Sequence, residues 1–215
     1  MIMNHANAAL LPQVQSLKLS HGQVLLVLRG TGLGSHMADT ALESMVKKLR
    51  RQNVPFEPDA RKFSQWEEVT YCYEHVAELA VAFKMQADGI AFRHITGLLI
   101  MHRPKLHKFY REAYLEAETG RGAPRTLLNA NAQTQNQDAR EITVGGLYLD
   151  FRATYSNGIM SSPGPVLLDP VQATERFMSI FDGLYPYPPL ALSQICQRVV
   201  KIADATPPVK RGRKA

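Results

Sequence analysis

Apolar residues recur at helical spacing in the middle of the chain. Residues 64–87 carry a stripe that includes Val76, Leu79 and Phe83, and Ser64 stands where an N-cap is expected. A helix is therefore predicted from about residue 64 to residue 87. This helix would be the supporting helix of the domain that continues through residues 89–120.

The N-terminal part shows weaker patterns. Short apolar runs predict two strands, over residues 14–19 and 23–28. Residues 40–52 repeat apolar positions every three or four residues, with Asp39 as the cap, and predict a helix whose Lys and Arg side chains are solvated. Residues 53–62 contain two prolines and are a candidate linker.

The segment 89–120 has the pattern of two helices separated by a break of three or four residues after Leu99. Thr96 supplies a small residue where the two helices would approach closely. The positions expected to be buried are Ile95, Leu99, Met101, Leu106 and Phe109. The positions expected to face outward are His102, Arg103, Lys105, His107, Lys108 and Arg111.

An apolar inner face with a cationic outer face suits a helix that enters the major groove of DNA. In this interpretation Lys105, Lys108 and Arg111 neutralise phosphates. Base edges would be read by a subset of Arg103, His107, Lys108 and Arg111. The alternative is a pair of packed structural helices whose cations are simply solvated.

The C-terminal half mixes strands and helices. Residues 126–139 are polar and fit either helix or loop, whereas residues 141–155 alternate and predict one or two strands. Residues 157–165 read as a loop. Helices are predicted over 170–183, with Pro170 in the first turn, and over 190–203.

These elements predict a mostly helical α+β fold, with a central helix-turn-helix unit and a short β element on either side. Four regions follow from the linkers and breaks. They are an N-terminal β/α segment (1–55), a helix-turn-helix DNA-binding domain (63–120), an α+β region suited to oligomerisation (126–205) and a disordered basic tail (206–215).

The segment 89–120 resembles the helix-turn-helix of certain phage and mobile-element DNA-binding proteins, including small-terminase-like ones. The resemblance covers 32 of 215 residues and implies binding to double-stranded DNA. Ile100 departs from the pattern, which usually has glycine in the turn. The residues that carry it are Gly89-Ile90, Ile95-Thr96, Leu98-Leu99, Leu106, Lys108, Tyr110-Arg111-Glu112 and Gly120.

The tail resembles an AT-hook core, in which an Arg-Gly-Arg segment lies in an A·T-rich minor groove. Lys210, Arg211 and Arg213 would contact DNA, and Gly212 would allow a close approach of the backbone. The alternative is a plain solubilising basic terminus. Either interpretation adds favourable charge near DNA.

Composition narrows the class of protein. A chain of 215 residues with 45% apolar residues can bury a core, and its formal net charge of +6 favours polyanions mildly. Two cysteines are too few for a disulfide framework. No apolar run reaches the length of a membrane span, and the N-terminus lacks a secretory pattern, so we expect a cytoplasmic protein.

Candidate catalytic chemistry is weak. Residues 30–35 are glycine-rich between an expected strand and a helix, but no Gly-Lys-Ser/Thr closes them, so a connecting loop is preferred to a phosphate site. His94, His102 and His107 lack the spacing and the partners of a metal site. We therefore predict no catalytic residues, no cofactor and no bound metal.

The sequence thus predicts a helix-turn-helix DNA-binding protein, with transcriptional regulation as the first role. A DNA-packaging or replication accessory protein is the alternative within that class. A protein-interaction or assembly factor is the alternative outside it. Because one recognition helix reads only a few base pairs, a homo-oligomer is expected.

Overall fold

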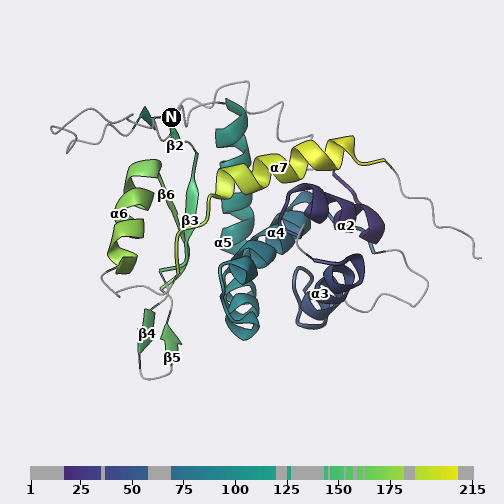
Figure 1. The fold of residues 1–215 in the computed structure, drawn as a ribbon, viewed down its shortest axis with the longest axis horizontal. Helices are drawn as coiled ribbons and strands as arrows, with labels where there is room; N and C mark the ends of the chain where they lie inside the picture. Colours follow the sequence, from purple (N-terminus) through teal and green to yellow (C-terminus); the bar gives the residue numbers. More distant parts are fainter. Residues whose placement is uncertain are drawn as a thin grey trace, which may run out of the picture.

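The computed structural model is mostly helical, with a small β element at one side (Figure 1). This confirms the predicted α+β, mostly helical class. The structure describes residues 17–34, 37–57, 69–119, 125–126, 143–144, 146–152, 154–156, 159–161, 163–181 and 187–207.

Five helices form the main body, and α7 lies across α5 and close to α2 in Figure 1. The helix α4 packs against α2, α5 and α7. The five helices are α2 (His21–Gly30), α3 (Asp39–Arg51), α4 (Tyr73–Ala87), α5 (Phe92–Thr119) and α7 (Leu192–Ala205).

The β element consists of three antiparallel two-stranded pairings beside α6 (Pro170–Phe181). In the central pairing, Tyr148 faces Leu168 and Asp150 faces Val166. The pairings join β1 (Arg125–Thr126) to β2 (Thr143–Val144), β3 (Tyr148–Asp150) to β6 (Val166–Leu168), and β4 (Thr154–Ser156) to β5 (Ile159–Ser161).

The core is centred on α4. Every residue from Val76 to Phe83 is buried, because neighbouring helices cover this helix on several sides. The buried run contains Glu78, whose side chain is fully inaccessible. A charged group at such a position requires a partner, which the neighbouring helix α5 supplies.

The strand predicted over 23–28 is wrong, because these residues lie in α2. Ser20 caps this helix: its side-chain oxygen accepts from the Gln23 backbone N–H at 3.4 Å. The Gln23 side chain in turn accepts from the Ser20 N–H at 3.0 Å. This reciprocal cap was visible in the sequence, and it fixes the start of a helix rather than a strand.

The strand predicted over 14–19 falls partly outside the described residues. Leu17 and Lys18 have no regular structure, and Leu19 forms an isolated antiparallel bridge to Tyr71. The β element expected before the central helices is therefore, within residues 17–57, a single bridge. Its partner comes from the residues just before α4.

Other predicted elements are confirmed with shifted ends. The helix over 40–52 is α3, whose cap position is Ala38 rather than Asp39. The helix predicted over 64–87 is α4, which begins at Tyr73; residues 69–72 are not helical, and 58–68 lie outside the described residues.

The C-terminal predictions hold for most described residues. The helices over 170–183 and 190–203 correspond to α6 and α7. The strands predicted over 141–155 are present as β2, β3 and the first part of β4. The loop predicted over 157–165 is wrong for Ile159–Ser161, which form β5. Residues 127–139 lie outside the described residues.

The predicted helix-turn-helix is wrong, because α5 runs without a break from Phe92 to Thr119. The prediction that Met101 is buried is wrong, because its side chain is 70% exposed. Ile95, Leu99, Leu106 and Tyr110 are all fully buried. Their separations of four, seven and four residues keep one face in phase across the expected break. The two apolar arms therefore belong to a single helix.

Pro104 lies inside α5 rather than at the start of a second helix. A proline there removes one backbone hydrogen bond, which would have joined its nitrogen to the Ile100 carbonyl. Ile100 and Pro104 are both exposed, so the proline lies on the solvent face of the helix. The buried face stays regular, and the helix continues.

Candidate nucleic-acid interface

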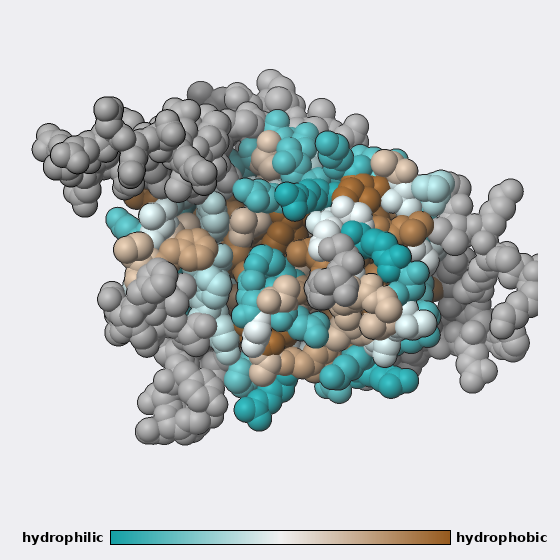
Figure 2. Space-filling model, viewed as in Figure 1, coloured by the Kyte–Doolittle hydropathy of each residue, from teal (hydrophilic) through white to brown (hydrophobic). Residues whose placement is uncertain are grey.

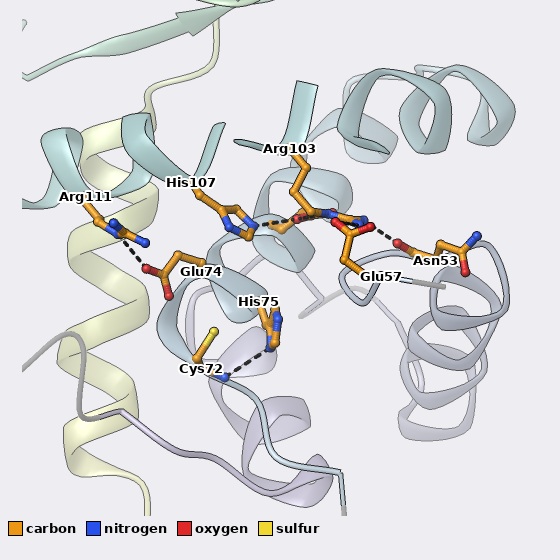
Figure 3. Close-up of polar contacts among 9 residues, drawn as sticks. Asn53, Glu57, Cys72, Glu74, His75, Arg103, His107 and Arg111 are labelled. Carbon is orange, nitrogen blue, oxygen red and sulfur yellow. Dashed lines mark hydrogen bonds and ion pairs between the residues drawn. The ribbon is translucent and has the colours of Figure 1, made fainter. Parts of the chain in front are cut away.

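Three of the predicted DNA-contacting residues point from α5 toward α4 and the segment before it (Figure 3). They are Arg103, His107 and Arg111, which are spaced four residues apart and so share a helix face. The opposing carboxylates are Glu74 and Glu78 of α4. This face is an ionic interface within the protein.

Arg103 is the centre of that interface and is 3% exposed. Its Nη2 lies 2.9 Å from Oε1 of Glu78, and its Nε lies 3.1 Å from both oxygens of the same carboxylate. Its Nη1 donates to Glu57 at 3.0 Å, and Nη2 also contacts the Asn53 carbonyl. A guanidinium held this way has no surface to offer to a phosphate, which corrects the prediction for Arg103.

His107 and Arg111 extend the same interface. Nε2 of His107 lies 3.2 Å from Glu78 Oε2, and Nε of Arg111 donates to Glu74 at 2.7 Å. Arg111 keeps 44% of its side chain exposed, whereas His107 keeps 24%. Both side chains therefore contact carboxylates of α4 within the protein.

The pKa shifts of Arg103 and Glu74 favour the charged forms of both side chains at this interface. Burial lowers the pKa of Arg103, but the carboxylates of Glu78 and Glu57 outweigh it and raise that pKa above its ordinary value. Burial would raise the pKa of Glu74, yet hydrogen bonds from its own backbone and from Arg111 lower it. The Arg111–Glu74 pair is consequently ionised at neutral pH.

The remaining predicted positions on α5 differ in accessibility. Lys105 and Lys108 are exposed; the first lies 5.6 Å from the Phe109 ring centroid, and the second 3.8 Å from Glu112. His102 is half-buried close to Gly164, and burial together with Lys105 lowers its pKa. The three predicted tail contacts, Lys210, Arg211 and Arg213, lie outside the described residues.

A second group of cations lies on α3. Its apolar side, which includes Val46 and Leu49, is fully buried, and its opposite side is exposed. We define the α3 surface as the exposed residues Lys47, Lys48 and Arg51 of α3 together with Arg93 at the start of α5.

The two parts of the α3 surface are joined by a cation–π contact. Nζ of Lys48 lies 4.2 Å from the centroid of the Phe92 ring, at the first residue of α5. Lys47 forms an exposed ion pair with Glu43 at 2.6 Å. Such surface pairs contribute little free energy and open readily when a stronger anion approaches. In Figure 2 hydrophilic residues are spread over the described part of this face, including the edge near α3.

Sequence reasoning found these α3 cations but treated them as simply solvated. The signal was the amphipathic pattern of residues 40–52, in which cations cluster in the last two turns. Arg50 is distinct from this group, because its guanidinium carbon lies 5.9 Å from the Phe56 ring centroid. The α3 surface therefore consists of cations that project outward from a well-anchored helix.

Among the described residues, no group of three or more His, Cys, Asp or Glu side chains is arranged to hold a metal ion. No helix within the described ranges has the length and apolar character needed to cross a membrane. Burial raises the pKa of Cys72 to about 11 and that of Cys196 to about 12, which disfavours the nucleophilic thiolate.

Comparison with known proteins adds no assignment. No protein-family model matches the chain, and neither the curated proteins nor the solved structures include a match. The candidate interface is therefore argued from its own geometry.

Proposed function

We propose that this protein binds double-stranded DNA through the α3 surface. The observation that carries the proposal is the placement of Lys47, Lys48 and Arg51 on the exposed side of a helix whose other side is buried. A helix of 13 residues is roughly 20 Å long and fits along a major groove about 12 Å wide.

The start of α5 would supply a flanking contact. Arg93 follows Phe92, and the packing of Lys48 on that ring holds the two helix ends together. Arg93 would meet a phosphate next to the groove that α3 enters, which sets orientation without reading sequence. The connection 31–38 between α2 and α3 is longer than a helix-turn-helix turn, so the proposal concerns α3 and not that motif.

Transcriptional regulation is the role we attach to this proposal, with DNA packaging or replication as the alternative. A footprint confined to a short defined sequence would favour the regulator, because base contacts by α3 would then discriminate among sites. Uniform protection of long duplexes would favour the packaging or replication role.

The decisive experiment titrates labelled duplex DNA with the full chain at several salt concentrations. Replacing Lys47, Lys48 and Arg51 together with Gln should weaken binding about a hundredfold at low salt. It should also lower the magnitude of the salt slope by about 0.9 for each lost phosphate contact. The matched control replaces Lys105 and Lys108 with Gln, which removes exposed cations of similar type from α5.

The two variants give opposed outcomes. Loss of binding in the α3 variant with retention in the α5 variant supports the proposal. The reverse result returns the interface to the originally predicted positions on α5, and absence of binding by the unmodified chain rejects DNA binding altogether.

A protein-interaction or assembly factor is the second candidate, and exposed apolar side chains favour it. Ile100 is 40% and Met101 70% exposed at adjacent positions of α5, and Met178 of α6 is 63% exposed. If the unmodified chain fails to bind DNA but sediments as a stable oligomer, this candidate replaces the first. An oligomer that does bind DNA would fit the homo-oligomer predicted from the sequence.

A further inference from the structure

The β element carries a cavity that the proposed DNA surface does not use. It has a volume of about 320 Å³ and is lined by residues of β3, β6 and α6. These elements lie on the side of the ribbon opposite α3 (Figure 1). This volume is within the range of small-ligand sites. The polar side chains that line it are Asp150, Arg152, Gln172, Glu175, Arg176 and Ser179.

The wall of the cavity contains a buried ion pair. Nε of Arg176 donates to Oδ2 of Asp150 at 2.7 Å, and the two side chains are 10% and 5% exposed. The other oxygen of Asp150 accepts from the backbone N–H of Arg152 at 2.9 Å. Both carboxylate oxygens therefore already serve the protein, and the charge of Asp150 is balanced.

Arg152 is held in an unusual conformation at the rim. Its φ is 49°, in the left-handed region that a residue with a side chain seldom adopts. The hydrogen bond to Asp150 fixes this backbone, and Arg152 itself is exposed. The ion pair in the wall joins Arg176 to Asp150 and does not include the guanidinium of Arg152. The fold thus holds the backbone of Arg152 in place and leaves its forked guanidinium exposed at the rim of the cavity.

We propose that this cavity binds a small ligand through an oxyanion group, a carboxylate or a phosphate, with Arg152 as the main contact. A guanidinium matches either group with two parallel hydrogen bonds. Because Asp150 balances the charge of Arg176, Arg152 supplies the positive charge of the site, whereas Glu175 at the exposed rim opposes the ligand. The site is independent of the α3 surface.

Calorimetric titration of the full chain without DNA tests this. Sodium succinate and inorganic phosphate are the two probes, and neutral succinamide at matched ionic strength is the blank. Arg152→Gln should weaken binding at least about tenfold. Glu175→Gln should tighten it about two- to fivefold, because a like charge is removed. Arg198→Gln, an exposed arginine of α7 outside the cavity, should leave it unchanged.

The pattern across variants decides the outcome. Binding of succinate, of phosphate or of both, lost in Arg152→Gln, supports the site and identifies the anion it prefers. Binding of neither probe at concentrations up to about 10 mM, which corresponds to the weakest affinity that the titration would detect, or equal binding by the Arg152→Gln chain, overturns it. Should Arg152→Gln not fold, Arg152→Lys keeps the charge but loses the fork, and unchanged affinity in that variant also overturns it. Because DNA is absent, either result leaves the DNA proposal standing.

Discussion

The helices α3 and α5 both carry clusters of cations and use them in different ways. On α5, Arg103, His107 and Arg111 turn inward to carboxylates of α4, and Arg103 is buried completely enough to exclude solvent. On α3, Lys47 and Lys48 project away from a buried apolar side. Charge density along a helix therefore does not by itself identify a binding surface.

The difference arises from the helix opposite. Glu74 and Glu78 are four residues apart on α4, which matches the four-residue spacing of Arg103, His107 and Arg111 on α5. The helices therefore meet with complementary charges in register. On α3, by contrast, Lys47 pairs with Glu43 of the same helix, and that ion pair is exposed.

Substitution of Arg103 by Met should have the largest effect on stability. It leaves Glu78 buried without its guanidinium partner, so we expect the free energy of unfolding to fall by about 3–5 kcal/mol. Urea denaturation followed by circular dichroism measures this. Lys108→Met, on the exposed face of the same helix, should change it by less than about 0.5 kcal/mol.

A double variant separates the ionic interface from simple packing. Adding Glu78→Met to Arg103→Met removes the stranded charge, so the double variant should recover most of the lost stability. Equal losses in the free energy of unfolding for Arg103→Met and Lys108→Met would show that the α5 cations are solvated like those of α3. The two helices would then not differ in how they use their cations.

Replacement of Pro104 by Ala tests the continuity of α5 directly. In a helix interior Ala restores a hydrogen bond to the Ile100 carbonyl and removes the ring clash, so the protein should gain about 1–3 kcal/mol. Thermal unfolding at fixed pH measures the gain. At the start of a second helix the same change would bring no such benefit, because proline is suited to that position. A neutral or destabilising result would thus favour two helices that are separated by a break, with Pro104 at the start of the second.

The fold class could be predicted because local patterns were strong. The amphipathic repeat of residues 40–52 and Pro170 at a helix start both gave elements that the structure contains. The strand predicted over 23–28 failed because five apolar residues in a row, from 24 to 28, fit either element. The cap formed by Ser20 and Gln23 would have decided it.

The candidate site was harder, because it depends on contacts between distant segments. The pattern of residues 89–120 suggested a break after Leu99, although Ile95 and Leu106 are eleven residues apart, about three complete helical turns. This spacing places Ile95 and Leu106 on the same helix face, and it was a local signal for one continuous helix. The burial of Arg103 depends on Glu78, 25 residues away, and on Glu57, 46 residues away. No short window of the sequence contains these partners.

The smallest expected effect concerns pH and the start of α4. Nδ1 of His75 accepts from the Cys72 backbone N–H at 3.3 Å, which requires an unprotonated nitrogen. Burial, with smaller contributions from His107 and Arg103, lowers the pKa of His75 from 6.5 to about 4. Below about pH 6.5 the unfolded chain therefore binds a proton that the folded protein does not. Stability should fall as pH decreases toward 4, and this contribution should be constant above pH 7.

In His75→Gln the amide can still accept the capping bond but does not titrate. Its loss of stability between pH 7 and pH 5, measured by urea denaturation, should be smaller than that of the unmodified chain by up to about 2 kcal/mol. Parallel pH profiles for the two proteins would mean that the acid-sensitive part of the molecule lies away from the packed α4 and α5 pair.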